Sequence, residues 1–328
     1  MFVLESNITI DSPINGAFAF TGVNECRINR SVGSMVDTAT LQLPTSARLK
    51  NSLEITEFPQ AGKLFSRGDK ITIQLGYNGL LRQEFKGFVK SISFSTPLVV
   101  ECEGYSYQIR QKNIKQSWKS VQLKELCEYL VQGTDIVISN QIPSLTIENY
   151  VVNNATALKV LEDVVQKYRL TAYFRFNELY VGLEETIKTG EVAYGLGYNT
   201  ADVKSLKYQE ETDIRMKVVA KTTKQDGERK LFEFGDTDGE VREIIVRPGA
   251  MDRIKEIAQD YLRKFKYTGY TGSLTGFLQP YAEPGYTCKV IDPRYPERNG
   301  NFFTHAVEVT YGMGGARRIV TLTKKLST

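Results

Sequence analysis

The residue types that most often do chemistry in proteins are few in this chain and widely spaced. Its 328 residues include one histidine, His305, and four cysteines, Cys26, Cys102, Cys127 and Cys288. His305 lies in a strand-like run without a serine or cysteine motif beside it, so we expect a structural or interface role. The cysteines form neither a CxxC pair nor a metal-ligand spacing. We therefore expect no catalytic residue, no metal site and no cofactor.

Paired carboxylates are the other feature that could support catalysis, because glycosidases use two of them across a cleft. Glu101 and Glu103 alternate with apolar residues, which favours a solvated polar face of a strand. Glu184 and Glu185 follow a strand-like run and are expected in a turn. A carbohydrate hydrolase acting on peptidoglycan stays as the alternative function that such pairs would require.

Phosphate and nucleic-acid chemistry are weakly indicated. The glycines of Gly195-Leu-Gly197 and Gly312-Met-Gly-Gly315 lack the spacing of a phosphate loop and are interpreted as ordinary loops. Arg317-Arg318 and Lys324-Lys325 are expected on a solvated or lumen-facing surface. The 42 Lys and Arg residues exceed the 38 Asp and Glu residues by only four, which disfavours a nucleic-acid-binding barrel.

The composition is that of an ordinary globular chain, with 41% hydrophobic and 24% charged residues. At roughly 100–200 residues per domain, the length allows two or three domains. No apolar run approaches the roughly 18 residues of a membrane-spanning helix, and the first residues lack the pattern of a signal peptide. Scattered thiols fit a reducing compartment, so we expect synthesis and folding in a cytoplasm.

The elements that would position these residues are mostly short strands. Ile71, Ile73 and Leu75 alternate with polar residues, and Asn78-Gly79 then supplies a tight hairpin turn. Residues 84–94 and 98–103 continue an antiparallel pattern. Several such strands joined by turns predict a small barrel or sandwich over residues 1–108.

The pattern changes after this first segment. Ser120 and Asn154 are predicted to cap two amphipathic helices, and a hairpin over residues 171–183 follows the second helix. Residues 109–190 are therefore expected to form an α+β insert. Strand patterns return over residues 191–328, interrupted by an amphipathic helix at 248–266. The predicted fold class is mainly β, with two small antiparallel β-barrels flanking the α+β insert.

The two predicted barrels share an order of elements. Residues 68–75 match 285–291, residues 85–94 match 300–310, and residues 98–102 match 319–323. Each set has a glycine corner, a strand, a glycine-containing strand and a third strand. Either the two barrels are related by an internal repeat, or two unrelated antiparallel meanders look alike. Two like barrels in one chain would let a trimer form a ring with nearly sixfold symmetry, able to match a sixfold partner.

Aromatic residues are numerous, with 18 tyrosines and 16 phenylalanines. They fill barrel interiors, and where exposed they favour interfaces because they bury a large area at low entropy cost. Tyr267, Tyr270 and Phe277 follow the predicted helix and are candidate interface contacts. Core packing is the alternative role for all three.

Several stretches in this order resemble the tail hub proteins of contractile phages, also called late control protein D. The first half of type VI secretion spike proteins shares this architecture. The stretches are DTATLQLP (37–44), FKGFVKSI (85–92), PLVVECEG (97–104), NATALKVL (154–161), YRLTAYFRFNELYVG (168–182), EPGYT (283–287) and GNFFTH (300–305).

The resemblance implies a homotrimeric, pseudo-hexameric ring with two barrels per subunit. It implies that one face of the ring docks on the tail tube and that the other carries a spike, which would be a separate protein because the chain ends after the second barrel. DNA or an effector would pass through the lumen. The protein would then be a structural component of a virion tail or injection particle, made in the bacterial host cytoplasm, and not an enzyme.

Overall fold

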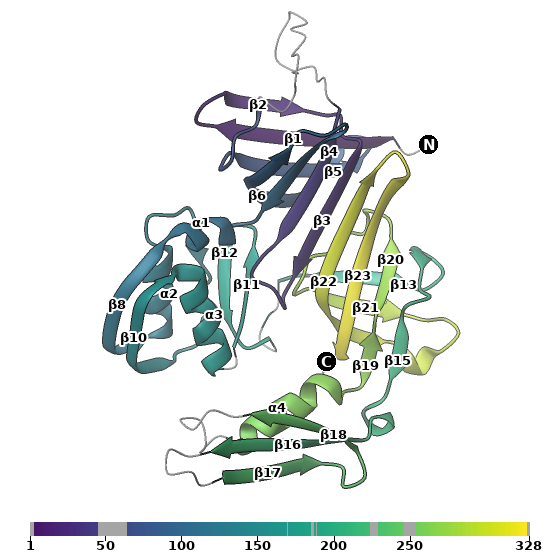
Figure 1. Ribbon diagram of the computed structural model, residues 1–328. Helices are drawn as coiled ribbons and strands as arrows, with labels where there is room; N and C mark the ends of the chain where they lie inside the picture. Colours follow the sequence, from purple (N-terminus) through teal and green to yellow (C-terminus); the bar gives the residue numbers. More distant parts are fainter. Residues whose placement is uncertain are drawn as a thin grey trace, which may run out of the picture.

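The computed structural model describes residues 3–44, 64–168, 170–184, 187, 189–223, 229–245 and 254–326. Most of its strands belong to one 15-stranded sheet, and three smaller sheets lie in two further units (Figure 1). The prediction of a mainly β fold with an α+β insert is confirmed. The chain has four parts: a first β-unit, a second β-unit, the α+β insert and a peripheral unit.

The first β-unit contains the strands between residues 4 and 103. Its order in the sheet is β2-β1-β5-β6-β7-β4-β3, and every one of these neighbouring pairs is antiparallel. The strands are β1 (Leu4–Ser12), β2 (Gly16–Phe20), β3 (Glu25–Ser31), β4 (Thr38–Leu43), β5 (Lys70–Tyr77), β6 (Leu80–Ser93) and β7 (Leu98–Glu103). Ile71, Ile73 and Leu75 all point into the core, as their alternation predicts.

The second β-unit contains residues 191–209 and 269–325. Here β21, β22 and β23 form an antiparallel meander, and β20 pairs with β23. The strands are β13 (Glu191–Gly195), β14 (Thr200–Asp202), β15 (Lys207–Gln209), β19 (Gly269–Thr271), β20 (Ser273–Gly276), β21 (Thr287–Ile291), β22 (Gly300–Gly312) and β23 (Gly315–Lys325). A short 3₁₀ helix (Pro296–Arg298) precedes β22.

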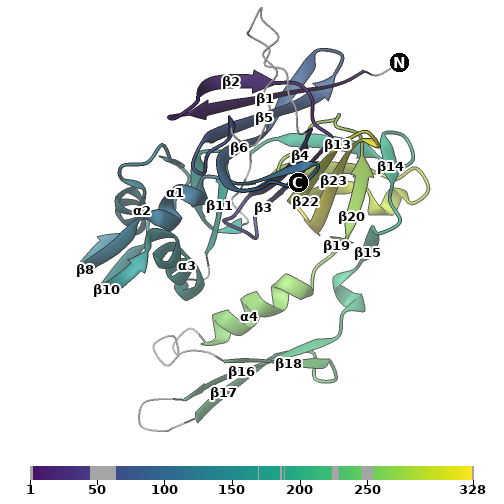
Figure 2. The same cartoon turned by 45° about the horizontal axis from the view of Figure 1, so that its top comes forward.

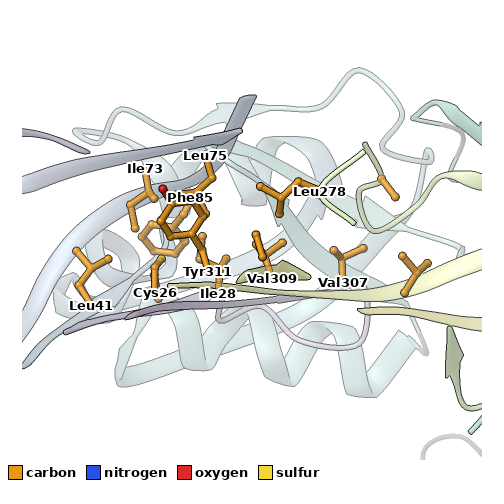
Figure 3. Packing of buried hydrophobic residues seen from close by; sticks show 14 of the residues in the cluster. Cys26, Ile28, Leu41, Ile73, Leu75, Phe85, Leu278, Val307, Val309 and Tyr311 are labelled. Carbon is orange, nitrogen blue, oxygen red and sulfur yellow. The ribbon is translucent and has the colours of Figure 1, made fainter. Parts of the chain in front are cut away.

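The two β-units are not separate bodies. β3 pairs with β22 from Ser31 opposite Ala306 to Glu25 opposite Gly312. Side chains on both strands enter one hydrophobic core, in which Ile28 and Val309 are each 1% exposed (Figure 3). The predicted barrels are therefore two halves of one continuous sheet.

The repeat seen in the sequence is reproduced by backbone hydrogen bonds. The N–H of Gly68 donates to the carbonyl of Val89, whose own N–H donates to Asp69. The N–H of Gly285 likewise donates to the carbonyl of Thr304, whose N–H donates to the residue after the glycine, Tyr286. Both glycines have positive φ angles, +93° and +86°, which favour glycine at this corner.

A β-bulge marks the same position in both halves. The register between β6 and β7 shifts after Val89, and the register between β22 and β23 shifts after Thr304. The bulged residues are Lys90 and His305. Matching corners, bulges and strand order show that the two meanders are structurally equivalent, with Val89 corresponding to Thr304.

The α+β insert packs beside β6 (Figure 1). Phe88 of β6 stacks on Tyr107 of the insert, with ring centroids 5.3 Å apart. The insert contains α1 (Ser106–Gln111), β8 (Asn113–Gln122), α2 (Leu123–Val131), β9 (Val137–Ile138), β10 (Thr146–Thr156), α3 (Ala157–Tyr168), β11 (Thr171–Arg175) and β12 (Glu178–Gly182).

Both predicted helix starts in the insert are wrong by two residues. The helices begin at Leu123 and Ala157 because Ser120 and Asn154 lie in the paired strands β8 and β10. A capping box formed by Gln122 and Glu125 starts α2. These two strands are largely exposed, so they lack the alternation that identifies a half-buried strand.

A fourth part, the peripheral unit (216–245 and 254–265), projects from the second β-unit (Figure 2). It contains β16 (Met216–Thr223), β17 (Arg229–Gly235), β18 (Glu240–Ile245) and α4 (Ile254–Phe265), and a short 3₁₀ helix (Glu211–Asp213) leads into it. The sequence predicts these elements as part of the second barrel. They instead form their own sheet because Val218 and Ala220 pack on Ala258 and Leu262 of α4. Residues 248–253 of the predicted helix lie outside the described residues.

Strands β6 and β7 approach each other closely at Gly87, and a substitution there tests how the two strands pack. A Cβ atom at Gly87 would lie 2.3 Å from the carbonyl oxygen of Glu103, whereas one at Gly314 would meet nothing within 4 Å. We expect Gly87→Ala to destabilise the fold by about 1–3 kcal/mol, since backbone must move to admit the methyl group. Thermal unfolding followed by circular dichroism measures this. An equal effect of Gly314→Ala would contradict the packing explanation.

Candidate functional site

A buried ion pair connects the two β-units. Nη2 of Arg318 in β23 lies 2.6 Å from Oε1 of Glu84 in β6, and the two side chains are 1% and 2% exposed. The same guanidinium donates hydrogen bonds to the carbonyls of Leu278 and Ala282. These bonds compensate part of the large desolvation penalty of a buried charge.

Glu283 forms the next part of this cluster and links it to the insert. Its Oε2 accepts a hydrogen bond of 2.9 Å from Nε of Arg175 in β11, and its Oε1 accepts one from the hydroxyl of Tyr281. Tyr281 also lies under Arg318, 4.8 Å from guanidinium carbon to ring centroid. The loop between β20 and β21 thereby contacts both β23 and the insert.

Arg30 of β3 completes the cluster. Its guanidinium lies 3.7 Å from Oδ2 of Asp37 and 3.8 Å from Oε1 of Glu283, and all three side chains are at least nine-tenths buried. Phe176, in the turn after β11, covers the guanidinium at 4.2 Å. Five separate segments of the sequence therefore meet in one largely buried charged cluster, which we call the charged junction: Arg30, Asp37, Glu84, Arg175, Tyr281, Glu283 and Arg318.

The three carboxylates of the charged junction differ in the direction in which their pKa values are shifted. Burial raises the pKa of Asp37 to about 7, although the charge of Arg30 opposes this effect. Burial also raises the pKa of Glu84, against the charge of Arg318. At Glu283 burial acts in the same direction, but Arg30, Tyr281 and Arg175 together outweigh it and lower the pKa. Glu283 is therefore the best-stabilised anion of the three.

The charged junction is built to hold parts of the chain together. Its carboxylates are almost completely buried and each already contacts a guanidinium. A pair of catalytic carboxylates needs an open cleft between them for substrate. The arrangement instead fixes the orientation of both β-units and the insert.

Two sequence-based expectations are wrong in this region. Arg318 is buried in the ion pair with Glu84, not on a solvated surface. Glu103 is also fully buried, where it accepts hydrogen bonds from Ser106 and Arg110, while Glu101 stays exposed. In both cases a distant or later residue supplies the partner that compensates burial of the charge. Glu283 lies in the EPGYT stretch, but nothing in that stretch indicates its arginine partners.

The remaining candidate residues take structural positions. Nδ1 of His305 lies 3.5 Å from Oε1 of Glu184, and this contact holds the pKa of Glu184 below its usual range. Glu185 lies outside the described residues. Gly312–Gly315 is the turn of the β22–β23 hairpin, and Gly195-Leu-Gly197 begins at the last residue of β13. All four cysteines are buried free thiols, and the described residues contain no metal-ligating cluster.

The three candidate interface aromatics are placed differently. Phe277 is 45% exposed, with the guanidinium of Arg317 5.1 Å from its ring centroid. The hydroxyl of Tyr267 donates to the carbonyl of Tyr270, and its side chain is partly buried. Tyr270 is only 3% exposed and packs on Phe302. Core packing is thus the role of Tyr270, while contacts through Phe277 and Tyr267 stay predictions.

Comparison with solved structures places this architecture among tail proteins. The 43 kDa tail protein of prophage MuSo2 from Shewanella oneidensis superposes with a TM-score of 0.67 at 13% identity, covering 98% of each chain. A tail protein from Neisseria meningitidis gives 0.65 at 11% identity, covering 97% of this chain and 96% of its own. The chain has the fold of these tail proteins.

A component of the Escherichia coli type VI secretion system shares the tail-protein fold at a TM-score of 0.53. Its identity is 10%, and the match covers 93% of this chain and 74% of that one. No protein-family model and no curated protein sequence matches the chain. Among the described residues, no helix is long and apolar enough to cross a membrane.

The ion pair between Arg318 and Glu84 makes a testable contribution to stability. Arg318→Met leaves Glu84 buried without its partner, and we expect a loss of about 3–5 kcal/mol. Arg318→Met combined with Glu84→Leu should recover much of this loss. Arg242→Met, which breaks an exposed pair with Glu240, should leave the unfolding temperature almost unchanged. A double variant no more stable than Arg318→Met would show that the buried carboxylate is not the cause.

The pKa of Asp37 predicts a specific pH dependence. Folding raises this pKa from 3.8 to about 7, so the folded chain binds more protons between these values and its stability falls as the pH rises through them. Asp37→Asn should make the change in unfolding temperature between about pH 5 and about pH 8 less negative. The exposed variant Asp11→Asn should keep the wild-type pH dependence. Identical profiles for Asp37→Asn and wild type would contradict the shift.

Proposed function

We propose that this chain is the structural hub of a phage-type contractile tail or a related injection machine. Three copies form a ring in which six similar β-units alternate around a lumen. One face of the ring joins the tail tube, and the other carries a spike. DNA or an effector passes through the lumen during injection.

One observation carries this proposal: two equivalent meanders lie in one continuous sheet. β5-β6-β7 and β21-β22-β23 share their corner glycines, their bulges and their strand order. A chain with two like units presents nearly the same surface twice, so a threefold ring of such chains approximates sixfold symmetry. This would match a hexameric tube on one face and a trimeric spike on the other.

The named roles of the similar structures support the same assignment. Two of them are tail proteins, and one is a component of a type VI secretion system. We infer assembly into a virion tail or injection particle after synthesis in the bacterial host cytoplasm. The division into residues 1–108, 109–190 and 191–328 stays our proposal for the domains, with the peripheral unit as an extension of the third.

We further propose that the chain acts through permanent interfaces and not as an enzyme. The hydrolase alternative requires two carboxylates facing a cleft. In the pair Glu101 and Glu103, the carboxylate of Glu103 is enclosed by Ser106 and Arg110. The arrangement of this pair therefore supports a structural role.

The ring predicts a defined mass in solution. Size-exclusion chromatography with light scattering should give about three times the 37.1 kDa of one chain. Negative-stain images of that peak should show rings with apparent sixfold features. A stable monomer at high concentration would refute the proposed ring. Release of sugar from peptidoglycan by the purified chain would refute the non-enzymatic role.

A further inference from the structure

One strand edge of the first β-unit is open where its counterpart in the second β-unit is covered. In β22, residues 306–312 pair with β23 on one side and with β3 on the other. In β6, residues 91–93 pair with β7 on one side, and pairing with β5 on the other side ends at Phe88. Among the described strands, none covers β6 beyond that point.

The equivalence of the two meanders shows which residue of β22 corresponds to each residue along this open edge. Because Val89 corresponds to Thr304, Phe94 corresponds to Val309. Val309 is 1% exposed and packs in the shared core beside Ile28 of β3, whereas Phe94 is 76% exposed. A large apolar side chain thus stands in solvent at a position that is core in the other half of the chain.

The strand that could cover this edge is found by the same equivalence. Leu41 of β4 pairs with Val100, and Leu274 of β20 pairs with Val320, so β4 corresponds to β20. β3 lies next to β4, and the segment 200–209 holds the corresponding place beside β20 and β19.

The residues of the segment 200–209 are matched to those of β3 through the residues that they face on β20 and β4. Glu25 faces Gln42, and Asp202 faces Thr275. Asp202 therefore corresponds to Glu25, and Ser205 corresponds to Ile28. In the described sheet, β15 pairs only with β19, so its outer edge is open, and Ser205 lies in the turn that precedes β15.

We propose that the open edge of β6 together with the residue that follows it, residues 91–94, pairs with residues 205–208 of a second copy of this chain. The contact repeats between subunits the ladder that β3 and β22 form within one chain, and it places Phe94 opposite Ser205 as Val309 lies opposite Ile28. It also buries an apolar edge that would otherwise promote aggregation.

This pairing is heterologous, because the two edges are different surfaces of the chain. Such contacts close into a ring when the rotation between subunits returns to the start. Closure after three copies rests on the proposed function, but the pairing of the two edges rests on the repeat alone.

A charge at the open edge tests the proposal. Phe94→Asp should convert the trimer to monomer in light scattering, since a carboxylate would be buried against the neighbouring strand. The unfolding temperature of the monomer should stay high, because the ring of Phe94 is exposed within one chain. Val151→Asp is the matched control: Val151 is 71% exposed on β10 of the insert, and its variant should remain trimeric.

A disulfide provides a second, positive test. Residues directly opposite in an antiparallel pair lie about 4.5–5.5 Å apart, within the reach of a disulfide. Phe94→Cys with Ser205→Cys in one chain should give a covalent trimer on a non-reducing gel after mild oxidation. Each single variant should stay uncrosslinked, because the four natural cysteines are buried and the new thiols then have no partner.

The outcomes separate this proposal from the ring itself. A wild-type monomer would refute the ring. A wild-type trimer that persists in Phe94→Asp and forms no crosslink in the double cysteine variant would keep the ring and refute this pair of edges. Loss of the trimer in Phe94→Asp but not in Val151→Asp, together with the covalent trimer, supports the assignment.

Discussion

The hydrogen-bonded ladder between β3 and β22 determines the rest of this architecture. The two strands lie at opposite ends of the sequence, yet they share one core through Ile28 and Val309. The chain between these two strands, which includes the insert and the peripheral unit, must fold without blocking that pairing. Because the ladder joins equivalent halves, it also fixes how one β-unit is placed relative to the other.

The charged junction lies where the two β-units and the insert meet, and it restricts how these parts are oriented relative to one another. Burying charges this deeply contributes little net stability, but their pairing is demanding in geometry. Arg30 contacts carboxylates from two segments, and Arg175 brings the insert to Glu283. Other packings of the same apolar surfaces would leave at least one of these charges buried and unpaired. Specificity of arrangement is therefore the contribution of this cluster.

Local patterns in the sequence predict the meanders well and the connections between them poorly. The alternation through Ile73 and the turn at Asn78-Gly79 depend only on neighbouring residues, and the structure has both. Arg318 and Glu103 look solvent-facing in sequence because the residues that neutralise them belong to other elements. Tyr270 could be core or interface until its packing on Phe302 is known. The peripheral unit escapes prediction because its strands resemble those of the second β-unit.

The covalent joining of two similar units has a thermodynamic consequence for the ring that we propose. Six separate units would each lose translational and rotational freedom on assembly, whereas three double units lose it only three times. Half of the contacts around the ring are made during folding, at the high effective concentration that a shared chain provides. Because the two β-units of one chain differ in sequence, the insert and the peripheral unit occur once per chain and therefore beside every second β-unit of the ring. A single chain then provides both a nearly sixfold ring of β-units and outer parts that repeat only three times.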